Sequence, residues 1–318
     1  MALLTIFSAP KPFTNPHIAT IQRNAIRSWT MLGPEVDVIL LGQEAGLADA
    51  AAELGVRHLP EVERNANGTP LVSSMFALAR SNSDAPLLGC VNADILLLPE
   101  ILTRARQVQE QIQARGKDAS FLIVGQRWDL EVSEELDFSS GWDERLRRRT
   151  QEQGRLHKAV GSDYFIFPRQ SYTQLPRFAI GRAGWDNWMI YAGRSGGWPV
   201  IDASDAIMII HQNHDYSHLP GGLPHYNLPE TDENVRLAGG KRAILMLGDA
   251  SHRLVQSPGD MSGVQILRRE MNWKRFWHEA EIFPIVSLRS PLLAEGFYFL
   301  FHPLQAYREW RWEARGKP

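Results

Sequence analysis

The stretch Leu87-Leu88-Gly89-Cys90-Val91-Asn92-Ala93-Asp94 places an apolar run directly before polar side chains. Such a short run of apolar and small residues is typical of a strand that is buried on both faces of a parallel sheet. Similar apolar runs occur at residues 2–8 and 36–41, and a helical pattern follows each of them. This alternation predicts an α/β fold with a mixed, mainly parallel sheet flanked by helices.

The first helix has the clearest boundaries in the sequence. Asn15 is a good N-cap, Pro16 suits the first helical position, and Gly33 with Pro34 ends the helix. Further helices are expected at 45–54, 71–80, 99–114 and 186–194. Further strands are expected at 56–59, 121–124, 164–167, 199–201 and 206–210. Residues 263–318 are rich in Trp and Arg, so we divide the chain into a domain at 1–262 and a helical C-terminal appendage at 263–318.

Composition excludes several classes of protein. Lys plus Arg number 34 against 36 Asp plus Glu, and this balance gives no field to hold a nucleic acid. Cys90 is the only cysteine, which excludes a disulfide framework and a thiolate metal cluster and favours a reducing cytoplasm. No run of about 18 apolar residues predicts a membrane span. The apolar stretch 292–301 is too short to span a bilayer, and we expect it to contact the inner face of the membrane, a second subunit or the main domain.

Polar side chains at the end of strand 87–91 predict a metal site. Alternate strand residues share a face, so Asn92 and Asp94 point the same way, into the crevice where open α/β sheets bind ligands. A carboxylate beside an amide can hold a hard divalent cation such as Mg²⁺. The alternative is that both side chains cap the turn before Pro99.

A second polar cluster follows the predicted strand 206–210. It runs His211-Gln212-Asn213-His214-Asp215-Tyr216-Ser217-His218. Imidazole and carboxylate groups are usual ligands of first-row divalent ions such as Mn²⁺. The alternative is a hydrogen-bonded loop with solvated histidines.

The segment 65–74 suits nucleotide binding. Gly68 permits unusual backbone angles, and the helix expected near residue 71 offers free N–H groups to a phosphate. Asn65, Gly68 and Ser73 are therefore predicted to contact the nucleotide. An ordinary capped loop is the alternative.

In their order along the chain, several segments resemble those of GT-A-type glycosyltransferases, the nucleotide-diphospho-sugar transferase superfamily, and in particular its family-2-like bacterial members. The matching segments are 6–13, 68–74, 91–94, 161–165, 184–188 and the cluster at His211. The resemblance implies a Rossmann-like GT-A fold over about residues 3–240. It also implies that Asp94 binds the metal and Asn92 faces the ribose, although Asn stands where the family has a first Asp. The family's late histidine corresponds to His211, with His214 as the alternative.

The resemblance also implies the remaining site residues. Ala9, Pro10 and Lys11 look like the family's base-binding loop, with Lys11 alternatively on phosphate. Asp186 resembles the catalytic base, and Asp163 is second for that role. Trp185 and Trp188 would stack on a sugar, and Asp215 would contact the acceptor. The structural alternative makes Asp186 an N-cap and places Trp188 in the core.

The sequence thus predicts a glycosyltransferase that uses Mn²⁺ or Mg²⁺ and a nucleoside diphosphate sugar such as a UDP- or GDP-sugar. The acceptor would be a hydroxyl of a glycan or lipid-linked molecule, transfer would invert the sugar, and the process would be polysaccharide biosynthesis at a bacterial surface. Three alternatives stay open. They are a nucleotidyltransferase, a metal hydrolase built on His211, His214, Asp215 and His218, and an inactive sugar-binding protein.

Overall fold

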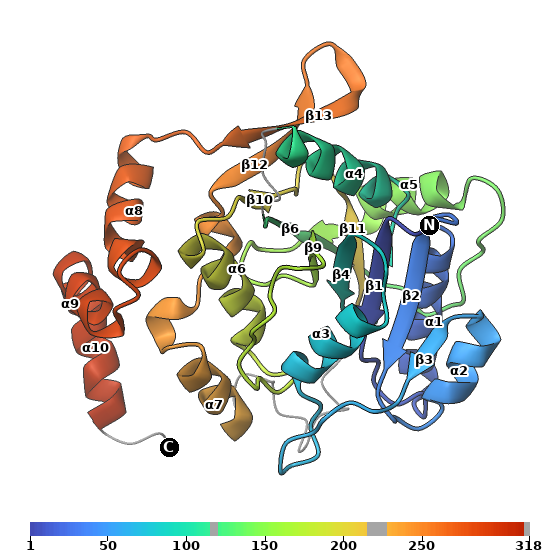
Figure 1. The fold of residues 1–318 in the computed structure, drawn as a ribbon, viewed down its shortest axis with the longest axis horizontal. Helices are drawn as coiled ribbons and strands as arrows, with labels where there is room; N and C mark the ends of the chain where they lie inside the picture. The colour runs from blue at the N-terminus through green and yellow to red at the C-terminus, as the bar shows by residue number, and fades with distance from the viewer. Residues whose placement is uncertain (115–119, 215–227, 315–318) are drawn as a thin grey trace.

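The computed structural model describes residues 1–114, 120–214 and 228–314 and shows a large mixed sheet between helices, with a smaller second sheet (Figure 1). The large sheet has the strand order β13-β12-β10-β6-β9-β4-β1-β2-β3. Its strands are β1 Leu4–Ser8, β2 Val36–Leu41, β3 Arg57–Leu59, β4 Leu87–Val91, β6 Leu122–Val124, β9 Tyr164–Pro168, β10 Val200–Asp202, β12 His252–Ser257 and β13 Asp260–Arg268.

Most neighbours in this sheet run parallel. β1 pairs in parallel with β2 on one side and with β4 on the other, so Leu4 lies opposite both Val36 and Leu87. Only β9 and β13 run against their neighbours among the strands described. The predicted α/β class with a mixed, mainly parallel sheet is confirmed.

Helices cover both faces of the sheet because side chains alternate along each strand. The helices are α1 Pro16–Thr30, α2 Leu47–Leu54, α3 Val72–Ser81, α4 Glu100–Gln113, α5 Trp142–Gln153, α6 Trp185–Ser195 and α7 Pro229–Leu237, with short 3₁₀ turns at Lys241–Ala243 and Leu247–Asp249. Ile6 of β1 packs in the same core as α1 and α4. Its neighbour Phe7 packs on the other face, with α3 and α6. Asn15 caps α1 as predicted, because its side chain accepts a hydrogen bond from the N–H of Ile18.

A second, four-stranded sheet was not predicted. It has the order β5-β11-β7-β8, with β5 Ile95–Leu97, β7 Arg127–Leu130, β8 Arg155–Leu156 and β11 Ile209–Gln212. β5 follows β4 after only three residues, so the chain passes from the large sheet to the small one at residues 92–94. Cys90, at the end of β4, is buried, and burial raises the pKa of its thiol.

The C-terminal segment is helical, but it begins later than predicted. Residue 263 falls inside β13, where Val264 and Ile266 are buried against the rest of the large sheet. The three helices α8 Trp273–Val286, α9 Pro291–Phe301 and α10 Pro303–Ala314 then stand together on the left of Figure 1. We therefore place the start of the helical appendage after β13 and correct the division at 262/263.

The appendage is attached to the main domain through α8 and α9. Ile282, Ile285, Val286 and Ala294 are buried in the core that also contains α6. Among the residues that the structure describes, no helix combines the length and the apolar character needed to cross a membrane.

Candidate metal centre

Asp94, His211 and His214 come together where the chain passes between the two sheets. Asp94 lies between β4 and β5, and β11 runs antiparallel to β5 with His211 opposite Ile95. The backbone N–H of Gln212 donates to the carbonyl oxygen of Asp94 at 3.2 Å. This register brings the end of β11, and with it both histidines, beside the Asp94 carboxylate.

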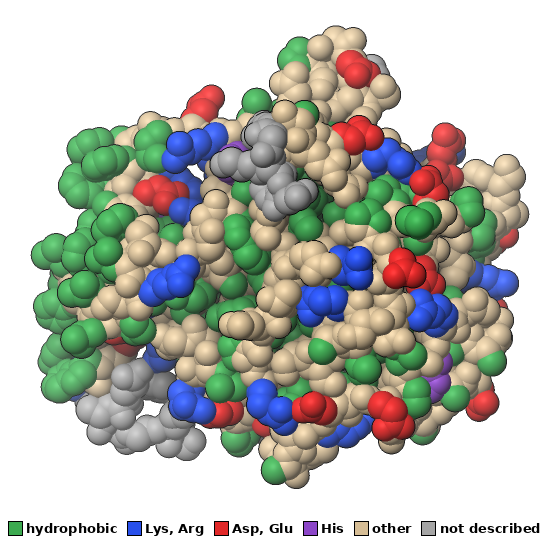
Figure 2. Space-filling view, in the orientation of Figure 1, with side chains coloured by type: hydrophobic (Ala, Val, Ile, Leu, Met, Phe, Trp, Pro, Cys, Tyr) green, Lys and Arg blue, Asp and Glu red, His purple; other side chains and the backbone are tan. Residues whose placement is uncertain are grey.

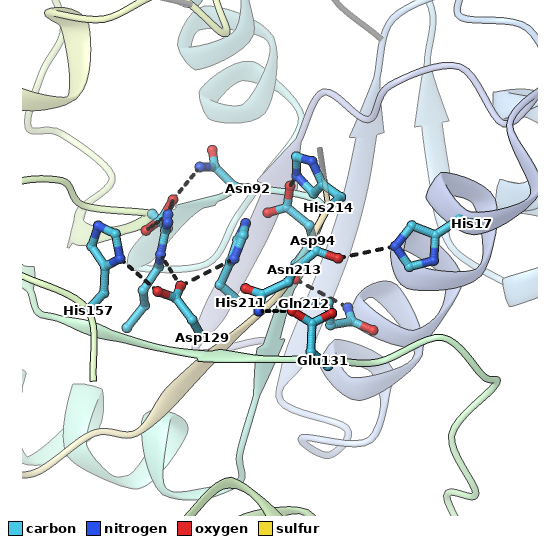
Figure 3. Close-up of polar contacts among 12 residues, drawn as sticks. His17, Asn92, Asp94, Asp129, Glu131, His157, His211, Gln212, Asn213 and His214 are labelled. Carbon is cyan, nitrogen blue, oxygen red and sulfur yellow. Dashed lines mark hydrogen bonds and ion pairs between the residues drawn. The ribbon is translucent and has the colours of Figure 1, made fainter. Parts of the chain in front are cut away.

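The geometry of these three side chains suits a divalent cation. One ligand atom from each lies within 4.8 Å of the others. The Nε2 atom of His214 is 3.0 Å from Oδ2 of Asp94. In Figure 3 the ring of His211 lies between Asp129 on one side and Asp94 with His214 on the other. One carboxylate and two imidazoles form a donor set for a first-row divalent ion.

Asp94 is prepared for a cation in two further respects. Its carboxylate is buried, and Oδ1 has no hydrogen-bond partner within the part of the chain that the structure describes. Such an atom is costly unless a ligand satisfies it. Burial opposes its ionisation, but Lys11, His214 and His211 outweigh burial and hold the pKa of Asp94 well below its usual range. Asp94 is therefore a carboxylate at all ordinary pH values.

Asp129 of β7 supports His211 from behind. Its Oδ1 is 3.4 Å from Nδ1 of His211, and its Oδ2 is 2.7 Å from Nδ1 of His157. Burial opposes ionisation of Asp129, but the two histidines and Arg127 hold its pKa well below the usual range. Among the described residues Nδ1 of His211 forms no hydrogen bond, so the 3.4 Å contact with Asp129 is an ion-pair distance only. In metal centres a carboxylate at this ring nitrogen accepts its proton and leaves the other nitrogen free to bind the ion.

Arg127 continues this network to Asp163 and Asn92. One terminal nitrogen of its guanidinium is 2.9 Å from both carboxylate oxygens of Asp163. The amide of Asn92 donates to Oδ1 of Asp163 at 2.9 Å. Asn92, predicted to face the ribose, binds Asp163 in this structure. Asp163, the second candidate for the base, is a buried carboxylate already paired with an arginine.

Arg127, Asp129 and His157 were not predicted from the sequence. Arg127 and Asp129 are two residues apart on one strand, so they share a face. That spacing is the signal that was available, but β7 has four residues and β8 only two. Runs this short carry no recognisable alternation.

Lys11 lies at the metal centre, in the loop after β1. Its Nζ is 3.4 Å from Oδ2 of Asp94 and 3.0 Å from Nε2 of His214. Gln22 of α1 holds the loop, since its side chain accepts from the backbone N–H of Lys11 and donates to the backbone carbonyl. Ala9 and Pro10 precede it, with Ala9 packed on the core and Pro10 buried.

The predicted nucleotide loop is organised around Asn65. Its side-chain oxygen accepts from the backbone N–H groups of Asn67 and Thr69, and its amide donates to Glu230 of α7 at 2.5 Å. Gly68 has φ +80°, one of the unusual backbone angles that a glycine was expected to permit at this position. Ser73 lies half-buried in the first turn of α3. The Asn65 side chain is thus used to build the loop and to join it to α7.

Asp186 lies in the first turn of α6, as predicted. Burial raises the pKa of its carboxyl to about 6, and the negative charge of Asp163 adds to the rise, against hydrogen bonds from backbone N–H groups. The two carboxyl groups are therefore within electrostatic range of each other. A carboxyl with a pKa near neutrality is suited to accept a proton during a reaction.

The tryptophans beside Asp186 do not both fit the sugar-stacking prediction. Trp185 is 5% exposed and packs on Phe165 with ring centroids 5.5 Å apart. Its ring is part of the core and offers no face to an acceptor, which corrects that prediction. Trp188 is half-buried against Phe178. The predicted acceptor residue Asp215, like His218 of the hydrolase alternative, lies outside the described residues.

No family model and no curated protein matches the chain. Solved structures similar to it include the mannosyltransferase PcManGT from Pyrobaculum calidifontis in complex with GDP-Man and Mn²⁺, with 12% identity over 68% of this chain and a TM-score of 0.40. The match covers 58% of that protein, which is less than two thirds of its length. Another is glucosyl-3-phosphoglycerate synthase from Mycobacterium tuberculosis in complex with Mg²⁺ and uridine-diphosphate, with 16% identity over 81% of each chain and a TM-score of 0.42. Function therefore has to be inferred from the side chains of the site.

Proposed function

We propose that this protein is a metal-dependent glycosyltransferase of the GT-A type, which moves a sugar from a nucleoside diphosphate donor to a hydroxyl acceptor. The observation that carries the proposal is the convergence of Asp94, His211 and His214 beside the end of β4, with a buried oxygen on Asp94 that has no hydrogen-bond partner among the described residues. Ligands of open α/β sheets bind at this end of the strands.

The three side chains would hold Mn²⁺ or Mg²⁺. Bound there, the ion would neutralise the oxygens of the donor diphosphate as it departs. Asp94 would supply the full negative charge, and Asp129, whose Oδ1 lies 3.4 Å from Nδ1 of His211, would orient that ring toward the ion. Lys11, which contacts Asp94 and His214, supplies a second positive charge within reach of a phosphate.

Asp186 would act as the general base. With a pKa of about 6 it is mostly ionised at pH 7 and still basic enough to take the proton of an acceptor hydroxyl. The carboxylate oxygens of Asp163 already accept hydrogen bonds from Arg127 and Asn92, so they are engaged within the protein. We therefore assign proton transfer to Asp186 and a supporting electrostatic role to Asp163.

Finer aspects of the function follow from the sequence resemblance. We propose a UDP- or GDP-sugar as donor, transfer with inversion, and an acceptor hydroxyl on a glycan or lipid-linked molecule in assembly of a bacterial surface polysaccharide. A single base positioned to activate the acceptor suits a one-step inverting displacement.

The test is a calorimetric titration of the full chain with Mn²⁺, followed by a panel of UDP- and GDP-sugars with and without the metal. We expect one donor to bind only with Mn²⁺ and to raise the melting temperature by mass action. Release of the nucleoside diphosphate would then be measured with hydroxyl acceptors.

The hydrolase and the sugar-binding alternatives each have their own outcome in this experiment. Nucleotide affinity that is unchanged by chelator would overturn the metal-dependent assignment. Metal-dependent cleavage of a donor with water alone, at the same rate with and without acceptors, would indicate the hydrolase. Binding without turnover of any donor would indicate a sugar-binding protein.

A further inference from the structure

The three C-terminal helices expose an unusual amount of apolar surface. Figure 2 shows hydrophobic side chains gathered along the left-hand edge of the molecule, over α8, α9 and α10. Six of these side chains are each at least 59% exposed: Trp273, Leu292, Phe299, Leu300, Leu304 and Trp310. An exposed patch of this kind marks an interaction site in a soluble domain.

Helix α9 is the extreme case. Its eleven residues read PLLAEGFYFLF, with Ala294 buried against the main domain and Leu292, Leu293, Phe297, Phe299 and Leu300 exposed. A helix that is apolar on most sides is normally enclosed by protein or lipid. At eleven residues it is too short to span a bilayer, which requires about 20. It is long enough to lie in the plane of one.

Aromatic side chains continue the patch from α9 to α8. Trp273, Phe276 and Trp277 contact one another with ring centroids 5.2 to 5.9 Å apart, and Trp277 also contacts Phe301 at 5.9 Å. Trp and other aromatic rings are enriched where a protein meets the interfacial region of a membrane. We define the apolar face as the exposed hydrophobic side chains of α8, α9 and α10.

The charges on these helices are unevenly paired. Glu279 binds Arg194 and Arg275, Glu281 binds His302, and both Glu295 and Glu309 bind Arg242. Each of these four acidic side chains is thus engaged with a partner inside the molecule.

The basic side chains behave differently. Lys274, Arg308 and Arg311 are exposed and form no ion pair within residues 1–114, 120–214 and 228–314. Lys274, Arg308 and Arg311 thus present unpaired positive charge beside the apolar face, whereas Glu279, Glu281, Glu295 and Glu309 are each held by a partner.

A basic pocket adjoins the apolar face. A cavity of about 230 Å³ at the base of α8 is lined by Arg194, Arg268, Arg269 and Arg275, together with the exposed apolar residues Met271 and Phe283. Glu279 and Asp202 are the carboxylates that pair with these arginines. The Nε of Arg269 is buried without a hydrogen-bond partner among the described residues. Four guanidinium groups against two carboxylates leave the pocket positive and able to hold a phosphate.

From these observations we propose that the apolar face binds the surface of an anionic lipid bilayer, with the arginine pocket beside it taking lipid phosphate. Apolar side chains enter the acyl boundary while unpaired Lys and Arg meet anionic headgroups. A symmetric dimer through the same face would bring the unpaired Lys274, Arg308 and Arg311 of both copies into one interface, where the nearby acidic side chains already have partners. Charge therefore favours lipid over self-association.

Flotation of the full chain with liposomes tests the proposal. We expect binding to vesicles of phosphatidylcholine mixed with phosphatidylglycerol, at least tenfold weaker binding to phosphatidylcholine alone, and a loss of binding in high salt. The double variant Leu292→Glu with Leu300→Glu should lose at least tenfold in binding. Met31→Glu is the matched control, since Met31 is also exposed but lies in the main domain.

Charge reversal separates the basic contribution from the apolar one. Arg308→Glu with Arg311→Glu should weaken binding to the anionic vesicles, whereas Arg148→Glu, an exposed arginine of α5, should not. Arg268→Ala tests the pocket and should reduce the preference for anionic over neutral vesicles. Near-ultraviolet circular dichroism and the melting temperature would confirm that each variant is folded.

Two results would overturn the proposal. One is equal flotation of the wild-type chain and the Leu292/Leu300 variant. The other is a dimer in light scattering without lipid that the same variant converts to a monomer, since the face would then be a self-interface. Neither result bears on the metal centre, so the proposed function would stand or fall separately.

Discussion

The metal centre and the apolar face of the C-terminal helices are opposites in their chemistry. At the metal centre charged groups are buried, and neighbours hold them ionised, as Lys11 and His214 do for Asp94. On the apolar face hydrophobic groups such as Leu292 and Leu300 are exposed. Folding alone favours neither arrangement, because burying charge and exposing apolar surface both cost free energy. The ligand proposed for each region, a divalent cation at the first and an anionic bilayer at the second, would offset that cost.

The largest effect is expected at Asp94, and it tests whether the buried charges of the metal centre serve to bind a cation. Asp94→Ala removes the one carboxylate of the ligand group, so we expect no measurable heat of Mn²⁺ binding. Donor affinity should fall by more than about a hundredfold, because losing a residue that only supports a metal ligand already costs up to that much. Calorimetry measures both. Asp84→Ala, an exposed aspartate before β4, is the control. Normal Mn²⁺ affinity in Asp94→Ala would rule out this metal centre.

Replacement of Asp186 should separate binding from chemistry. We expect Asp186→Asn to bind the donor normally and to lose turnover by on the order of a hundredfold or more, as for loss of a general base. The wild-type rate should rise with pH through about 6, as the carboxyl becomes ionised, and the variant should lack that rise. If Asp163→Asn shows this pattern instead, the roles of the two carboxyl groups are exchanged.

The same replacement has a stability consequence. The folded pKa of Asp186, about 6, is above its ordinary 3.8, so the fold binds this proton more tightly than the unfolded chain does. Its stabilising effect is complete below pH 3.8 and is lost as pH rises through 6. At pH 8 the unfolding free energy of the Asn variant should therefore exceed that of the wild type by up to about 3 kcal/mol. Its melting temperature should be correspondingly higher. A lower melting temperature at pH 8 would contradict the raised pKa.

A smaller effect is expected at Asp129, which contacts His211 rather than the ion. Asp129→Ala should weaken Mn²⁺ binding about ten- to a hundredfold, because the ring of His211 loses the carboxylate that orients it. Asp129→Asn keeps an acceptor oxygen and should recover part of the affinity. Equal affinity in both variants and the wild type would show that Asp129 has no part in the metal centre.

The smallest effect, and the only expected gain, is at Lys11. Its ammonium group repels a cation bound to Asp94, so Lys11→Met should raise Mn²⁺ affinity by about threefold to tenfold, the worth of roughly 1 kcal/mol, as for two unit charges about 4 Å apart screened by water. The same variant should bind the nucleoside diphosphate more weakly. Calorimetry of the metal and then of the donor measures the two opposite changes. Tighter donor binding would remove Lys11 from the phosphate site.

Much of the fold could be predicted because local patterns and tertiary structure agree in the first hundred residues. The cap at Asn15 and the strand that ends before Asn92 lie where the sequence indicates. β11 shows where prediction ended: it was expected at 206–210 and observed at Ile209–Gln212. Polar Gln212 reads as a loop residue, yet it is fully buried because its amide binds the carbonyl oxygens of Ile21 and Asp94 and its oxygen accepts from Asn24.

The candidate metal ligands could be predicted from the sequence, but the side chains that contact those ligands could not. Asp94 and His211 were identified by residue type at strand ends, whereas Asp129 reaches His211 only through the pairing of β7 with β11. Pairing of short strands far apart in sequence leaves no trace in local composition. The prediction that Trp185 stacks on a sugar was wrong for a related reason. An indole beside a carboxylate can face either a ligand or the core, and the sequence does not distinguish the two.

The position of Asp94 between the two sheets has a mechanical consequence. Asp94 lies in the connection between β4 of the large sheet and β5 of the small one, while His211 lies in β11 and His214 follows it. An ion held by them would fasten one sheet to the other, so opening the small sheet alone would require releasing the ion. Amide hydrogen exchange in β7 and β11 should then slow toward the rate of global unfolding when Mn²⁺ is added. The metal centre would then also stabilise the connection between the two sheets, each of which has its own hydrogen-bond network.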